Sequence, residues 1–394
     1  MKFKQVKIED VADVTKLAGF EFTKYIKYNE TGEIIALRAI NIRNNTLDLT
    51  DIKRINKSVS ESLIRSKLYK DDIILTYTGN GAGAAAIIDE NDQYHLAPNI
   101  CKITPKEINP YYLYKYITSN KFQKEISNNI GGSGQPTIPM KTIRVLPISV
   151  PSRCNQTKIA KILKNIDDKI KLNNEINNNL HDLCNNLYFK LVSQLNDTNS
   201  SVESIKNVAK CVLGGTPSRT KKDYWNGSIN WINSGEINKF RIIKASEKIT
   251  ELGLNKSSTT LLPRGTTVLA ITGATLGQVS RLEIDSCANQ SVIGIITNKK
   301  ELNNYIYLSI LNSINDLVLK QTGGAQQHIN KNDVETHEII VPSTELISQF
   351  DEIIRPLFDQ ISVNCFEVNK LEQLRDTLLP KLMNGEIDLD SIEI

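Results

Sequence analysis

Apolar residues recur at helical spacing through residues 152–192, a segment that follows Pro151 and contains neither glycine nor proline. Numbered as heptads, the segment places apolar side chains at a and d positions and a polar residue, Asn173, at the central a position. A stripe of this width is typical of a coiled coil and is too narrow for a helix in a globular core. A helix of about forty residues extends about 60 Å. The pattern therefore predicts a long helix that buries its narrow stripe against a partner helix.

The partner lies in the same chain, because the sequence repeats itself. The segment GGSGQPTIPMKTIRVLPISVP, ending at Pro151, aligns without gaps on TGGAQQHINKNDVETHEIIVP, ending at Pro342, at an offset of 191 (342 − 151). The same offset places Asn173 on Asn364 and keeps a second apolar stripe in register with the first. The predicted helix-pairing seam consists of Ile159, Ile162, Ile166, Asn173, Ile176, Leu180, Leu183 and Leu187 in the first helix and Phe350, Ile353, Leu357, Asn364, Leu371, Leu374 and Leu378 in the second. We expect Asn173 and Asn364 to contact each other and to fix the register at some cost in stability.

The second helix is predicted to begin near Ser343 and to run to Leu379. Pro356 falls about three turns into it, where a proline produces a local kink. Pro380 and Gly385 are expected to end the helix.

Upstream of each helix the repeat is weaker but persists. DDIILTYTGNGAG resembles GTTVLAITGATLG at an offset of 194, which places Gly79 on Gly273. The chain is therefore divided into a globular domain at 1–150, a helix at 151–200, a second globular domain at 201–342, and a helix with a C-terminal tail at 343–394. Because the helices match best, the two globular domains are expected to do related but different jobs.

Both globular domains mix short strand-like and helix-like segments. In the first domain, residues 33–42, 73–77 and 143–150 are predicted as strands, and residues 110–127 as a helix whose tyrosine stripe packs in the core. Strands and helices alternate irregularly, so the predicted fold class is α+β.

Composition excludes several classes of protein. The 394 residues carry a net charge of only +4, which permits nucleic-acid binding without arguing for it. No apolar run approaches 18 residues and the N-terminus has no apolar segment, so secretion and membrane insertion are not expected. Six scattered cysteines form no C-x-x-C pair and four histidines show no ligand spacing, so we expect reduced thiols, a cytoplasmic location and no metal site.

Two motifs resemble catalytic ones but lack their context. TYTGNGAGAAAI is glycine-rich, yet no helix of sufficient length follows it, so a turn joining two strands is favoured over a phosphate-binding loop. NPYY, beginning at Asn109, resembles the Asn-Pro-Pro-Tyr signature of amino-methyltransferases without its second proline. No P-loop and no Ser/His/Asp set is present, so we expect a protein without catalytic activity of its own.

The loop at residues 218–225 brings basic and aromatic residues together. Arg219, Lys221 and Lys222 stand beside Tyr224 and Trp225, a combination that suits phosphate and base contact. A solvated loop anchored by a buried Trp225 explains the same spacing equally well, so both interpretations stay open at this point.

Three segments resemble one known family. LEQLRDTLLPKLMNGEIDL (371–389) resembles the end of the second spacer helix in the specificity (S) subunits of type I restriction–modification systems. GGTPSRTKKDYWNGSINWINSGEI (214–237) resembles the opening of a target-recognition domain in that family, and VPSRCNQTKIAKIL the start of its first spacer. The resemblance extends over the whole chain, although the first domain lacks the Thr-Pro-Ser loop.

The resemblance implies a DNA-recognition subunit that is not an enzyme. Each target-recognition domain would contact half of an asymmetric, bipartite double-stranded DNA site. The two spacer helices would pair as an antiparallel coiled coil with pseudo-two-fold symmetry, set the gap between half-sites, and dock two methyltransferase (M) subunits, which the restriction/translocase (R) subunits then join. S-adenosylmethionine, ATP and Mg²⁺ would bind to these partners, so no cofactor is expected on this chain.

Candidate DNA contacts follow from loop position and side-chain chemistry. Asn and Gln can read adenine edges and Arg can read guanine, whereas Lys mostly contacts phosphates. The predicted contacts are Lys24, Lys27, Arg38, Arg43, Thr78, Asn80, Gln135 and Thr137 in the first domain and Ser218, Arg219, Lys221, Lys222, Tyr224, Thr272, Gln326, Gln327 and His328 in the second.

Two other functions remain open from the sequence. A coiled-coil scaffold that spaces two protein-binding domains, without binding DNA, would show the same helices. A diverged restriction–methylation polypeptide is disfavoured because no S-adenosylmethionine or nuclease motif was found.

Overall fold

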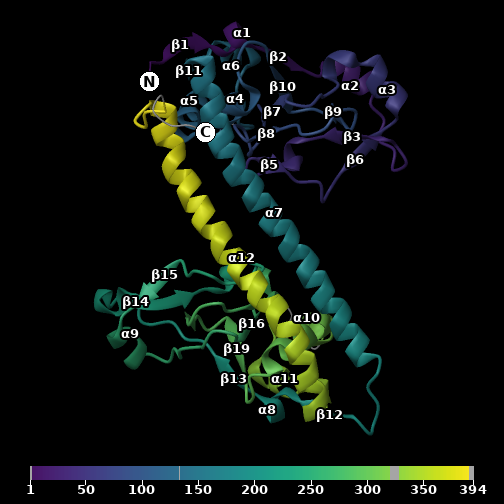
Figure 1. The fold of residues 1–394 in the computed structure, drawn as a ribbon, viewed down its shortest axis with the longest axis vertical. Coiled ribbons are helices and arrows are strands. Elements are labelled where there is room, and N and C mark those ends of the chain that lie inside the picture. Colours follow the sequence, from purple (N-terminus) through teal and green to yellow (C-terminus); the bar gives the residue numbers. More distant parts are fainter. Residues whose placement is uncertain (1, 133, 320–327, 390–394) are drawn as a thin grey trace. The chain divides into compact units, whose positions relative to one another are not determined.

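The computed structural model describes residues 2–132, 134–319 and 328–389. It divides into two compact units, one formed by Met1–Lys169 with Leu371–Ile394 and the other by Ile170–Lys370 (Figure 1). Each unit therefore contains one globular domain together with a segment of each long helix.

The first unit contains three small antiparallel or mixed sheets and a two-residue hairpin. Its strands in the described residues are β1 (Lys4–Lys7), β2 (Ala12–Lys16), β3 (Ile34–Leu37), β4 (Ile42–Arg43), β5 (Thr46–Leu47), β6 (Lys53–Ile55), β7 (Ile73–Thr76), β8 (Ala85–Ile87), β9 (Tyr94–Leu96), β10 (Ile100–Pro105) and β11 (Pro147–Val150). The central sheet has the order β2-β10-β7-β8, a second sheet the order β6-β3-β9, and β1 pairs with β11. All neighbours in the central sheet are antiparallel, and β7 and β8 form the hairpin expected for the glycine-rich segment.

The helices of the first globular domain are short. They are α1 (Ile8–Val11), α2 (Gly19–Tyr25), α3 (Lys57–Ser62), α4 (Pro110–Ile117), α5 (Asn120–Asn128) and α6 (Met140–Val145), with 3-10 turns η1 (Ala39–Asn41) and η2 (Ile64–Ser66). The core between the central sheet and α4 includes Tyr112 and Tyr116, so the tyrosine stripe is core packing as predicted.

The second unit repeats this architecture. Its strands in the described residues are β12 (Ser200–Ser204), β13 (Ala209–Leu213), β14 (Trp225–Ile232), β15 (Glu247–Ile249), β16 (Thr267–Ala270), β17 (Val279–Arg281), β18 (Cys287–Ala288), β19 (Val292–Thr297) and β20 (Glu338–Pro342). Its helices and 3-10 turns are α8 (Ile205–Val208), η3 (Lys222–Tyr224), η4 (Ser234–Glu236), α9 (Glu251–Asn255), η5 (Gly273–Thr275), α10 (Leu302–Leu319) and α11 (Lys331–Glu335). The central sheet has the order β13-β19-β16-β17, and β12 pairs with β20, which matches the first unit strand for strand.

The two long helices are α7 (Arg153–Val192) and α12 (Thr344–Asn384) (Figure 1). Within the second unit they run antiparallel, since Asn173 donates to Oε2 of Glu367 (2.8 Å) and Asn364 donates to Oδ1 of Asn177 (2.9 Å). The predicted contact between Asn173 and Asn364 is therefore wrong by one helical turn. Asn173 instead bonds to Glu367, three residues after Asn364, and Asn364 bonds to Asn177, four residues after Asn173. Asn173 and Asn364 are both buried.

In both helices, the second buried position of the seam is not the predicted d position. The a positions are buried or half-buried, but Leu183, Ile353 and Leu374 at the d positions are 44%, 59% and 47% exposed. The buried positions instead lie one residue later, at Leu163, Asn177, Cys184, Ile354, Ile361 and Leu382. The physical reason is that the helices also pack on the domain cores, which include Leu163 and Leu382 in the first unit and Cys184 and Ile354 in the second.

Several predicted boundaries also differ. Residues 110–127 form two helices because Ser119 caps the second one, accepting a hydrogen bond from the backbone N–H of Phe122. Residues 33–42 form β3 and then a 3-10 turn, and residues 143–150 begin inside α6 before β11 starts at Pro147. Helix α12 continues through Pro380 and ends before Gly385, whose φ of +76° suits the residue that follows a helix.

Candidate nucleic-acid interface

Two loops cross at the end of the central sheet in the first unit. Thr78, in the loop after β7, forms an isolated antiparallel bridge with Thr137, in the loop before α6. The backbone N–H of Gly79 donates to the carbonyl of Pro136 (2.8 Å), and the hydroxyl of Thr137 donates to that of Thr78 (3.3 Å). We call residues 77–83 and 134–138 the crossed loops of this unit. Asn80 and Gln135 are exposed on them, so the structure brings four predicted contacts together.

The second unit has the same pair of crossed loops, at residues 271–277 and at the segment that begins with His328. Thr272 bridges His328 in the same way, and Ile329 N–H donates to the carbonyl of Ile271 (3.0 Å). The corresponding bond of the first unit runs from Ile138 to Tyr77 (2.9 Å). The predicted contacts Gln326 and Gln327 lie outside the described residues.

Gly214 and Gly215 allow the next loop of the second unit to pass between two backbone segments. A Cβ on Gly214 would lie 2.1 Å from the carbonyl oxygen of Asn289, and one on Gly215 would lie 2.7 Å from the backbone carbon of Ser258. The chain therefore requires glycine at both positions for steric reasons. Just beyond, the hydroxyl of Thr216 donates to the side chain of Gln290 (2.5 Å).

Arg219 is held in place by two neighbours. Its Nη1 and Nη2 donate to the two carboxylate oxygens of Glu247 on β15 (3.0 and 2.6 Å). Its guanidinium carbon lies 3.7 Å from the centre of the Trp225 ring, a close cation–π contact. Trp225 in turn donates through Nε1 to the carbonyl of Ser218 (3.2 Å). These contacts fix the conformation of the loop and pair most of the charge of Arg219.

The other residues of this loop differ in their access to solvent. Lys221 donates to the hydroxyl of Tyr224 (3.0 Å), and this hydrogen bond raises the pKa of Lys221. Tyr224 is only 6% exposed, so its ring is not available to stack on a base, which corrects the predicted contact there. Ser218 and Lys222 are exposed.

The basic residues predicted for the first unit lie apart from its crossed loops in the sequence, and two are paired. Arg38 forms an ion pair with Asp51 (3.0 Å) and Arg43 with Asp48 (3.1 Å). Lys24 lies on α2 with its Nζ 5.1 Å from the ring of Tyr25, and the neighbouring Lys27 is exposed. The paired carboxylates reduce what Arg38 and Arg43 can contribute to phosphate binding.

Sequence reasoning missed two residues beside the crossed loops. Lys16, at the end of β2, places its Nζ 5.2 Å from the ring of Tyr77, next to Thr78. Gln290 lies beside Ser291, whose carbonyl accepts from the N–H of Ile271 (3.0 Å). Nothing in the sequence pairs Lys16 with Tyr77 or places Gln290 beside Thr216, so neither residue could be selected.

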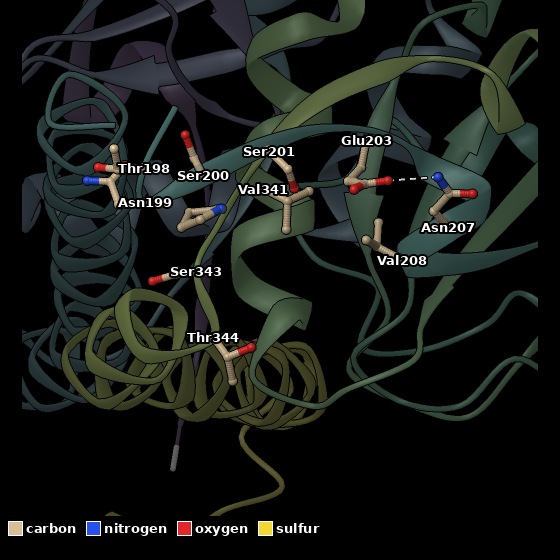
Figure 2. Close-up of a pocket in the computed structure, with 11 residues that line it drawn as sticks. Thr198, Asn199, Ser200, Ser201, Glu203, Asn207, Val208, Val341, Ser343 and Thr344 are labelled. Carbon is tan, nitrogen blue, oxygen red and sulfur yellow. Dashed lines mark hydrogen bonds between the residues drawn. The ribbon is translucent and has the colours of Figure 1, made fainter. Parts of the chain in front are cut away.

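A cavity of about 460 Å³ lies elsewhere in the second unit, where β12 and β20 meet the start of α12 (Figure 2). Its lining is mainly hydroxyl and amide side chains, and Asn207 donates to Glu203 across one wall (2.7 Å). None of the lining residues belongs to the crossed loops, so the cavity is separate from the candidate interface.

No helix in the described part of the chain is long and apolar enough to cross a membrane. No group of three or more His, Cys, Asp or Glu side chains in that part could hold a metal ion.

Comparison with known proteins identifies the family. The type I restriction modification DNA specificity domain matches residues 1–182 and 198–373, which is most of the chain. The chain belongs to this family. It is a DNA specificity subunit, the non-catalytic component of a type I restriction–modification system.

Relatives of this specificity subunit match over most of their length. It is 22% identical to the HindI specificity subunit of Haemophilus influenzae, covering 93% of this chain and 96% of that one. It is 24% identical to the MjaIX specificity subunit of Methanocaldococcus jannaschii, covering 72% and 69%. The crystal structure of the type I S subunit from M. genitalium superimposes with a TM-score of 0.66 at 15% identity, covering 97% and 96%, so the two share a fold. Two globular domains and two long helices are thus the expected α+β architecture of a specificity subunit.

Proposed function

We propose that the specificity subunit reads an asymmetric, bipartite DNA site, with one half-site contacted by the crossed loops of each unit. The observation that carries this proposal is the recurrence of one loop pair, Thr78 with Thr137 in the first unit and Thr272 with His328 in the second. Both pairs occupy corresponding positions on sheets of the same strand order, while Thr137 of the first pair is replaced by His328 in the second. One frame carrying different side chains suits two half-sites of different sequence.

Within this proposal, exposed amides read bases and exposed lysines contact phosphates. The side chains of Asn80 and Gln135 each offer a donor and an acceptor, which is the pattern that matches an adenine edge. Lys16 and Lys222 would contact the DNA backbone and position the loops without reading sequence. The other predicted loop contacts remain part of the proposal, except for the ring of Tyr224.

Arg219 takes a different part from the one its chemistry first suggested. The two hydrogen bonds from Arg219 to the Glu247 carboxylate use one N–H of each Nη atom. The negative charge of Glu247 also offsets the positive charge of Arg219, which would otherwise attract phosphate. We assign Arg219 to anchoring the loop that carries Ser218 and Lys222, with Nε and the remaining Nη hydrogens available toward DNA.

The family suggests the rest of the assembly. Two M subunits would dock on the paired helices and R subunits would join them, with S-adenosylmethionine, ATP and Mg²⁺ on those partners. The proposal also includes a pseudo-two-fold relation between the two units. It further places the action of the subunit in the cytoplasm, where the host DNA lies.

The test measures duplex binding by the subunit in complex with its methyltransferase partner at two salt concentrations. The target duplex comes from mapping methylated adenines in the host genome with and without the gene. We expect retention of the target over unrelated duplexes, and Gln135→Ala should lose about 1–3 kcal/mol of discrimination at one or two positions. Equal retention of all duplexes would favour the scaffold function instead.

The matched lysine variants separate positioning from reading. Lys222→Ala should weaken binding to every duplex alike and reduce the salt slope by about 0.9. Lys190→Ala, which removes an exposed lysine on α7, should do neither. If Gln135→Ala and Lys222→Ala both changed only sequence-independent binding, the division of roles would be wrong.

A further inference from the structure

In the first unit, one carboxylate joins the globular domain to both long helices. Asp167 on α7 forms an ion pair with Lys115 of α4 and accepts a hydrogen bond from the hydroxyl of Tyr111. Its other oxygen accepts from Nη1 of Arg375 on α12 (3.2 Å). The side chains of Lys115, Asp167 and Arg375 are only 8%, 20% and 27% exposed. We call these four residues the Asp167 cluster.

The second unit has apolar residues at three of the four corresponding places. The hydroxyl of Tyr112 donates to the carbonyl of Ser149 on β11, and that of Tyr305 donates to the carbonyl of Ile340 on β20, so the two tyrosines correspond. The helix α4 therefore aligns on α10 at an offset of 193 (305 − 112), and the strands and long helices align at 191 (340 − 149). Applied to the Asp167 cluster, these offsets place Lys115 on Leu308, Asp167 on Phe358, and Arg375 on Cys184.

Those three residues are fully enclosed in the second unit. Leu308, Phe358 and Cys184 are 0%, 1% and 0% exposed and belong to one hydrophobic cluster. At these three positions the junction of the second unit is apolar, and its polar contacts with α12 lie elsewhere. Asn304, which corresponds to Tyr111, donates to Asp351 (3.2 Å), and Ser362 donates to Glu283. The difference is physical as well as chemical, because apolar contact is non-directional, whereas hydrogen-bonded ion pairs hold only in a narrow geometry.

The Asp167 cluster is connected to the DNA-facing loops through α4. Lys115 lies on α4, which ends with the carbonyl of Ile117. Gln123 donates to that carbonyl (2.8 Å) and also to the carbonyl of Gly83 (2.9 Å), at the end of the crossed loop that carries Thr78. A rotation of α4 about its axis would therefore move this loop.

Burying these charges costs free energy of folding unless each charged group keeps its partners. Burial lowers the pKa of Lys115, although the neighbouring Asp167 carboxylate acts in the opposite direction. An apolar replacement of similar volume is often neutral or stabilising, while removal of one partner is strongly destabilising. Burial of charged groups at three positions where the second unit has apolar residues therefore suggests a role in geometry and not in stability.

We propose that Asp167 is a positioning residue that fixes the orientation of the first recognition domain on the two long helices. Its charge network then determines where the first half-site lies. This inference rests on the proposed reading of a bipartite site.

The experiment maps methylated sites in cells that express the subunit variants with its methyltransferase partner. Asp167→Asn should keep both half-site sequences but raise methylation of sites whose gap differs by one base pair at least about tenfold relative to wild type. Asp168→Asn is the matched control, because Asp168 is the next residue, is exposed, and pairs only with Lys164 on the same helix among the described residues. It should leave the gap preference unchanged.

A second variant covers the case in which Asp167→Asn does not fold. The triple variant Lys115→Leu, Asp167→Phe and Arg375→Cys places the three apolar residues of the second unit at these positions. It should fold and should show the same relaxed preference for the gap between half-sites. Wild-type gap preference in whichever of the two variants folds would overturn the inference, and failure of both to fold would show that the cluster serves stability. The proposed function itself would fail separately, if the wild-type complex methylated no bipartite site.

Discussion

The buried asparagine pair between the long helices gives the sharpest test of their register. Asn364 donates to Oδ1 of Asn177 and in turn accepts from Gln360 (2.7 Å), while Asn177 and Asn364 are 3% and 4% exposed. Asn364→Leu leaves a buried acceptor on Asn177 without its donor, which costs about 1–3 kcal/mol. Asn177→Leu strands the donor of Asn364 in the same way. The double replacement leaves neither group unsatisfied and should be neutral or stabilising.

Native-state hydrogen exchange at the amides of α7 around residue 177 measures this locally, without requiring the whole chain to unfold in one step. Each single variant should exchange about 5–150 times faster than wild type, and the double variant should return to the wild-type rate or below it. The coupling energy, which is the effect of the double variant minus the two single effects, then has a magnitude of about 2–6 kcal/mol. Val363→Ala is the control, since its side chain is 60% exposed beside Asn364 and should change the exchange rate little. If the two single effects added within about 0.5 kcal/mol, the pair would not act as a unit and the reasoning would be refuted.

Three other predictions follow from burial and close contact. In chemical denaturation, Leu163→Ala should lower the free energy of unfolding by about 2–5 kcal/mol, because Leu163 is fully buried. Leu183→Ala, at a 44% exposed position, should lower it by less than about 1 kcal/mol, and equal costs would contradict the observed helix face. Gly214→Ala should destabilise the second unit by more than about 1 kcal/mol, since its Cβ would meet backbone atoms, while Gly81→Ala has open space and should be near neutral in the same thermal unfolding assay. Burial lowers the pKa of His95, so the unfolded chain takes up a proton first as pH falls below 6.5, and stability of the first unit is lost there by up to about 1.4 kcal/mol per pH unit. His95→Gln should remove this component in hydrogen exchange of β9 measured at pH 7.5 and 5.5; an unchanged pH slope would show that His95 is not its source.

The repeat and the helices could be predicted because their signals are local or duplicated. The bounds of α7 follow directly from the absence of glycine and proline in residues 152–192. The second seam position could not be chosen, because apolar residues stand side by side at Ile162 with Leu163 and at Ile353 with Ile354. A heptad template fits either residue of such a pair. The domain cores, which no local pattern encodes, decide which one is buried.

The candidate interface was predictable in its loops and less so in its side chains. Thr78 and Thr137 were both selected from loop position, but their contact spans 59 residues and depends on the sheet. The partner of Arg219 is Glu247, 28 residues away, so the sequence offered no reason to expect a paired arginine. Exposure is likewise a tertiary property, as Tyr224 shows by being buried beside an exposed Lys222.

The first unit combines two segments that are far apart in the sequence, and this affects the order in which the units fold during synthesis. Leu382 and Leu389 are buried in its core, and Lys158 donates to the carbonyl of Leu389 (2.7 Å), so this core includes residues that are made after the second unit. After residue 169 leaves the ribosome, residues 170–370 must be synthesised before the core can close, which takes about 10–40 s at about 5–20 residues per second. The second unit, made without interruption, is complete first. The N-terminal recognition domain, although translated earlier, is therefore the last to acquire its native core.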